Sequence, residues 1–100
     1  MSIDPKELQQ SIVERLKDVI DPETGADIIR MRLIEDLILE NDGQVRYTFR
    51  PSSPLCPIAV YLVQQIKEAV AEVPDVTRQS ITVTGYVAAE ELTKLINKEN

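Results

Sequence analysis

The residue best suited to chemistry in this chain is its single cysteine, Cys56. Pro57 reads as the first residue of a helix, which would place Cys56 at the N-cap, facing unpaired backbone N–H groups and the positive end of the helix dipole. Such a position favours thiolate over thiol, as in reactive or metal-binding cysteines. Ser52 and Ser53 precede it and can donate hydrogen bonds to the sulfur or to a bound group. A lone cysteine is more often a small buried apolar residue, so both interpretations stay open.

A second cluster of polar groups is Asp21-Pro22-Glu23, which places two carboxylates in one turn. The ordinary interpretation is a solvated turn in which Asp21 accepts hydrogen bonds from local backbone. Arg30 and Arg32 follow at strand spacing and could contact an anion, although a solvated face is the commoner role for such residues.

The residues that are missing exclude several classes of function. The chain has no histidine, so Ser-His-Asp and Cys-His catalysis within one subunit are excluded, as is a zinc site of Cys and His ligands. Its three glycines are scattered, which excludes a Gly-rich phosphate loop. The chain has only four aromatic residues, three tyrosines and one phenylalanine, which are too few for a base-stacking platform.

Charge and cysteine content bear on partners and location. A formal net charge of −6 argues against nucleic acid and against an anionic membrane surface as partners. RNA binding is further disfavoured because the chain lacks a GxxG loop. No apolar run is long enough to span a bilayer, and the first residues do not resemble a secretory signal. One cysteine forbids an internal disulfide, and we therefore expect a cytoplasmic protein.

The elements that must position these residues follow one another without a long linker, so residues 1–100 are predicted to form one domain. Apolar spacing predicts helices over 5–20, 57–73 and 88–97, and strands over 33–40, 44–50 and 78–84. The fold class expected is α+β, a two-layer αββαβα sandwich in which helices cover one face of a small mixed sheet. The predicted core contains Leu37, Val45, Tyr47, Phe49, Leu62, Ile66, Ile81 and Val83. The other face carries Arg46, Thr48, Arg50, Ser80, Thr82 and Thr84, and either stays wet or meets a partner.

Two segments resemble the signatures of a known family. The run from Asp21 to Ile29 is similar to DPE-x-G-x-[DN]-I-V, and the run from Ser52 to Pro57 is similar to T-[TS]-P-x-C-P. Both belong to the PaaD-like and SufT-like iron–sulfur assembly family, once called domain of unknown function fifty-nine. The chain departs from the pattern at Thr24, where leucine is common, at Met31-Arg32, where Leu-Gly is usual, and at Ser52, which replaces threonine.

The resemblance implies an accessory factor in iron–sulfur cluster assembly or delivery, with scaffold and apo-client proteins as partners. Its functional site would consist of Asp21, Glu23, Ser52, Ser53 and Cys56, with Cys56 as a transient cluster ligand. A cluster generally needs four ligands, so one cysteine implies no stably bound cofactor, and a homodimer would supply only two. Because a hairpin brings the outer ends of its strands together, the two motifs are expected to converge in one shallow pocket.

Two other functions remain open at this point. In an enzyme, Cys56 would act as nucleophile with Asp21 or Glu23 as base, but nearby negative charge disfavours the thiolate. In a pure interaction adaptor, Cys56 would have no chemical role.

Overall fold

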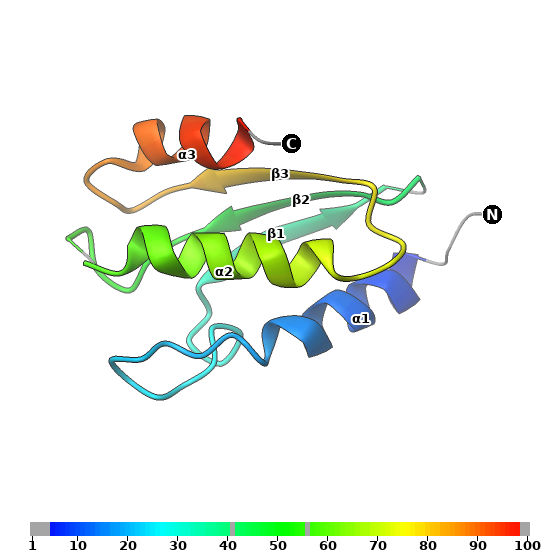
Figure 1. Cartoon of the computed structure of the whole chain (residues 1–100), viewed down its shortest axis with the longest axis horizontal. Coiled ribbons are helices and arrows are strands. Elements are labelled where there is room, and N and C mark those ends of the chain that lie inside the picture. The colour runs from blue at the N-terminus through cyan, green and yellow to red at the C-terminus, as the bar shows by residue number, and fades with distance from the viewer. Residues whose placement is uncertain (1–4, 41, 56, 99–100) are drawn as a thin grey trace.

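The computed structural model describes residues 5–40, 42–55 and 57–98 and contains three helices and three strands (Figure 1). Their bounds are α1 Pro5–Leu16, β1 Ile34–Leu39, β2 Gln44–Phe49, α2 Ala59–Ala71, β3 Arg78–Val83 and α3 Ala89–Asn97. The strand order is β1-β2-β3, with β1 antiparallel and β3 parallel to the central β2. The predicted α+β class and its αββαβα order are therefore confirmed.

The core lies between the sheet and the helices α1 and α2. Figure 1 shows α2 lying across the sheet, with α1 beside it. β2 and β3 alternate strictly between buried and more exposed residues, as a sheet with one covered face must. Seven of the predicted core residues are buried and the eighth, Leu37, is half-buried against them. Each such aliphatic or aromatic side chain contributes roughly 1.5–3 kcal/mol through burial.

β1 differs from the simple alternation that its sequence suggests, which would have placed Glu35 on the apolar face. The pairing with β2 runs in register at Glu35↔Thr48 and resumes at Ile38↔Arg46, so two β1 residues stand opposite one β2 residue. One of them, Asp36, has a φ of 53°. This bulge turns Glu35 to the exposed face and restores the apolar residues on either side of it to the core face.

The first helix is shorter than its apolar pattern predicts. It ends at Leu16, whereas the pattern extends to residue 20. Val19 remains buried, but its carbonyl accepts a hydrogen bond from the Ile28 amide at 3.1 Å. Ile20 forms an isolated bridge with Asp27. The apolar residues after Leu16 therefore pair with the returning loop instead of extending the helix.

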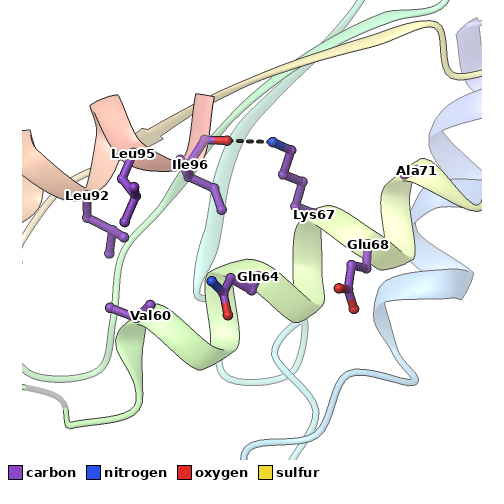
Figure 2. Close-up of a pocket in the computed structure, with 8 residues that line it drawn as sticks. All are labelled: Val60, Gln64, Lys67, Glu68, Ala71, Leu92, Leu95 and Ile96. Carbon is purple, nitrogen blue, oxygen red and sulfur yellow. Dashed lines mark hydrogen bonds between the residues drawn. The ribbon is translucent and has the colours of Figure 1, made fainter. Parts of the chain in front are cut away.

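The third helix lies along the free edge of β3 rather than over the covered face. The Asn97 side chain accepts from the Ile81 amide at 2.9 Å and donates to the Ile81 carbonyl at 2.7 Å. Thr93 Oγ1 accepts from the Val83 amide at 2.8 Å. Figure 2 shows the Lys67 ammonium donating to the Ile96 carbonyl, which ties α2 to the last turn of α3. Only one flank of α3 is thus buried, through Leu92 and Ile96, whereas Leu95 is exposed.

Among the described residues, no helix has the length and apolar character needed to cross a membrane.

Candidate functional site

Asp21 is a buried residue, only 2% exposed, that organises the turn after α1. Its carboxylate accepts a hydrogen bond from the Glu23 amide at 2.8 Å, and its carbonyl accepts one from the Gly25 amide at 2.7 Å. Its own amide donates to the Ala26 carbonyl at 2.9 Å. Gly25 adopts a φ of 74°, which glycine tolerates without strain. Asp21 therefore bonds local backbone, as the ordinary interpretation of the turn expects, but it is buried and not solvated, while the Glu23 side chain is exposed.

The segment after this turn connects the first motif to the second. The Asp27 carboxylate accepts from the Arg30 amide at 2.8 Å, and the Leu33 amide donates to the Ile28 carbonyl at 3.1 Å. The Leu33 carbonyl in turn accepts from the Arg50 amide at 2.8 Å, at the start of the loop that carries Ser52. The hydrogen bond between Arg50 and Leu33 thus holds the end of the first loop against the start of the second.

The second loop exposes both serines. The Ser53 hydroxyl accepts from the Leu55 amide at 3.3 Å, and the Pro54 carbonyl accepts from the Val87 amide at 2.8 Å. Cys56 lies outside the described residues.

The start of α2 corrects one prediction. The helix begins at Ala59 and its N-cap is Ile58, which has no side-chain cap, so Pro57 is not the first helical residue, and the N-cap position predicted for Cys56 is held by Ile58. The first backbone hydrogen bond of the helix is accepted by the Ile58 carbonyl, from the Leu62 amide. Pro57 and Ile58 form a turn ahead of the helix, and the helix-dipole argument for a reactive thiol therefore lapses.

A groove of about 860 Å³ lies between α1, β1 and the two loops. Ser52 lines it together with Met31 and Arg32 from the end of the first loop. Asp21 and Glu23 do not line it, and no hydrogen bond or ion pair of the described residues joins them to Ser52 or Ser53. Both loops lie at the same end of the molecule, on the left in Figure 1. Convergence of all five residues in one pocket stays a prediction.

Sequence reasoning did not find this groove, nor a second hollow of about 400 Å³ between α2 and α3 (Figure 2). The second hollow contains none of the predicted site residues. In the described ranges, no group of three or more Asp, Glu, Cys or His side chains is placed to hold a metal ion. The one sequence signal that pointed toward the larger groove is Arg32, which departs from the Leu-Gly pattern of the resembled family.

Comparison with known proteins agrees with both motifs. Residues 9–83 match the family model described as iron–sulfur cluster assembly protein, a range that contains both loops. The chain is 36% identical over 69 residues to the Fe-S protein maturation auxiliary factor YitW of Bacillus subtilis, covering 69% of this chain and 68% of that protein. It is 28% identical over 65 residues to the Fe-S protein maturation auxiliary factor SufT of Staphylococcus aureus, covering 65% of this chain and 74% of that one.

The fold also matches a solved structure, a domain of unknown function (DUF59) from Bacillus anthracis. The TM-score is 0.73 at 23% identity, and the match covers 95% of this chain and 92% of that one. At this identity the likeness bears on the fold alone.

Proposed function

The chain belongs to the iron–sulfur cluster assembly protein family, and from that premise we propose that it is an accessory factor that helps deliver iron–sulfur clusters to apo-proteins. The observation that carries the proposal is the family match over residues 9–83, which spans the Asp21 turn and the Ser52 loop together. The maturation-factor names of its relatives support the same role.

The cluster is cargo in this proposal and not a resident group. With one cysteine and no histidine, the chain offers too few of the usual ligands for a cluster, which generally has four. Cys56 would supply one thiolate during transfer, and the scaffold or the apo-protein would supply the others. The partners proposed are therefore a cluster scaffold and apo-client proteins, contacted one after the other; a homodimer would add only a second thiolate.

The remaining site residues have supporting roles in this proposal. Asp21 holds the first loop in shape through its hydrogen bonds to Glu23 and Gly25. Ser52 and Ser53 are exposed on the second loop, where their hydroxyl groups can donate to a sulfide or thiolate of the cargo. An enzyme with Asp21 as base receives less support, because that carboxylate is buried and already accepts a backbone hydrogen bond.

Complementation in cells that lack the native copy tests the proposal, with the activity of iron–sulfur enzymes as the readout. Cys56→Ala and Cys56→Ser are expected to leave these activities near the level of the deletion. Ser80→Ala is the matched control, because it removes an exposed hydroxyl from the uncovered face of the sheet and should complement fully.

Immunoblots are needed to check that each variant accumulates to the wild-type level. Full complementation by Cys56→Ala would remove the sulfur from the mechanism and leave a non-catalytic interaction adaptor. If wild-type expression fails to restore iron–sulfur enzyme activity, the accessory role itself is wrong.

A further inference from the structure

The groove between α1 and β1 has one apolar wall beside a set of polar and charged residues. Val13 of α1 and Ile29, Ile34 and Leu37 from the β1 side line it, and all four are half-buried rather than fully covered. A side chain that packs against this wall should be apolar, because a polar group buried there would lose its water without gaining a hydrogen-bond partner. Its volume, about 860 Å³, is sufficient for several side chains of an extended segment.

Arg32 lines this groove in a backbone conformation that arginine adopts only at a cost. Its φ is 59°, in the left-handed region that favours glycine. The turn is fixed by a hydrogen bond from the Arg32 amide to the Ile29 carbonyl at 3.0 Å. A non-glycine residue held in this region is one of the features that accumulate at ligand-binding positions.

The Arg32 guanidinium is exposed and forms no ion pair with any carboxylate of the described residues. Two other charged residues line the groove, Glu35 and Arg50. The Arg50 side chain packs against Gly85, with its Cγ 3.1 Å from where a Cβ would stand on that glycine. The groove thus carries a local positive balance on a chain whose net charge is −6. Guanidinium groups bind carboxylates through two parallel hydrogen bonds.

From these observations we propose that the groove binds an extended segment of a partner protein in which an apolar side chain is followed or preceded by Asp or Glu. The apolar side chain packs against Val13 and Ile34, and Arg32 binds the neighbouring carboxylate. Arg32 is then a specificity-determining residue of this chain. Ser52, a residue of the proposed functional site, lines the same groove. The inference rests on the proposed function in one respect, which is that the bound segment belongs to a cluster scaffold or an apo-client protein.

A random heptapeptide library displayed on phage, selected on the immobilised full chain, tests the proposal without requiring a known partner. Selected peptides are expected to be enriched in Asp or Glu next to an apolar residue. Synthetic copies of the enriched peptides should lose at least about fivefold in affinity for Arg32→Gly, as expected for the loss of one exposed charge-assisted contact. Replacing their acidic residue by its amide should cause a similar loss on the wild type and little further loss on Arg32→Gly.

Arg30→Gln is the matched control, because it removes the same charge two residues away and Arg30 does not line the groove. It should bind the peptides as the wild type does. Arg32→Gly should also raise the unfolding midpoint, since glycine relieves the strained φ, so that weaker binding cannot be attributed to a damaged fold.

Three outcomes would overturn the proposal. They are the absence of acidic enrichment, equal loss of affinity in Arg30→Gln and Arg32→Gly, and peptide-induced NMR shifts that spare Val13, Ile29 and Ile34. A single-stranded RNA decamer that binds better than the peptides and loses affinity with Arg32→Gly would assign the groove to nucleic acid instead. Cys56→Ala should bind the peptides as the wild type does, because Cys56 has no role in the proposed peptide site. Peptide binding and cluster delivery can therefore fail independently, and the two results can be told apart.

Discussion

The contact between Asn97 and the edge of β3 offers the sharpest test of how the fold is held together. Asn97→Ala removes both side-chain hydrogen bonds to Ile81, at 2.9 and 2.7 Å, and a third that the Asn97 side-chain Nδ2 donates to the Thr93 carbonyl at 2.9 Å. The Ile81 amide and carbonyl point away from β2, so no strand of the described sheet can replace the lost partner. The Ile81 side chain itself is fully buried, which limits access of water to its backbone.

The expected cost follows from the number of bonds lost. A typical intramolecular hydrogen bond contributes about 0.5–1.5 kcal/mol net, and water will replace part of the loss at this half-buried position, so we expect a destabilisation of about 2 kcal/mol. For a domain of this size, that lowers the unfolding midpoint by roughly 10 °C. Hydrogen exchange at the Ile81 amide should accelerate with it.

Urea and thermal unfolding followed by circular dichroism measure the change in unfolding free energy. Lys98→Ala is the control, because Lys98 is the exposed neighbour at the end of the same helix, and it should change the stability by less than about 0.5 kcal/mol. A loss for Asn97→Ala as small as that of the control would show that water replaces these bonds and that the remaining contacts of α3, through Leu92, Ile96 and the Thr93 hydroxyl, are enough to dock it.

Three further changes should report on separate features. Burial raises the pKa of the Tyr47 phenol above its ordinary value, so above about pH 10 only the unfolded chain releases this proton. Stability should therefore fall by up to about 1.4 kcal/mol per pH unit, and a Tyr47→Phe variant should lose that slope in urea titrations at high pH. Gly43→Ala should destabilise by about 2 kcal/mol or more, because its φ is 91° and a Cβ would lie 2.3 Å from the Asp75 carbonyl oxygen; an unchanged unfolding midpoint would refute this. Asp21→Ala should cost about 1–2 kcal/mol through loss of the bond to the Glu23 amide, whereas Asp21→Asn keeps an acceptor and should cost less; equal losses would contradict the turn-forming role.

Strict alternation made part of the fold predictable. Val45, Tyr47 and Phe49 recur every second residue and are buried, and the short connection that contains Asp42 and Gly43 leads from β1 to the antiparallel β2. A period of two has few competing interpretations when one face of the sheet is covered.

The parts that were wrong depended on interactions that no local pattern records. The bulge at Asp36 corrects the misplaced Glu35 only when β1 pairs with β2. The helical spacing of Val19 continues past the end of α1, but its carbonyl bonds Ile28 instead. For the candidate site, the sequence identified both loops, whereas the groove beside Ser52 exists only because α1 and β1 lie next to each other.

The two edges of the sheet have a consequence for aggregation. Unpaired edge strands are templates on which another chain can add a strand. On β3, the Ile81 and Val83 amides are already bonded to Asn97 and Thr93, so an incoming strand would first have to displace α3. On β1, the bulge interrupts the ladder and exposes the carboxylates of Glu35 and its neighbour, which a flat, regular fibril edge does not accommodate. The folded chain therefore presents no long regular edge in its described sheet, and polymerisation through strand addition would require α3 to detach first.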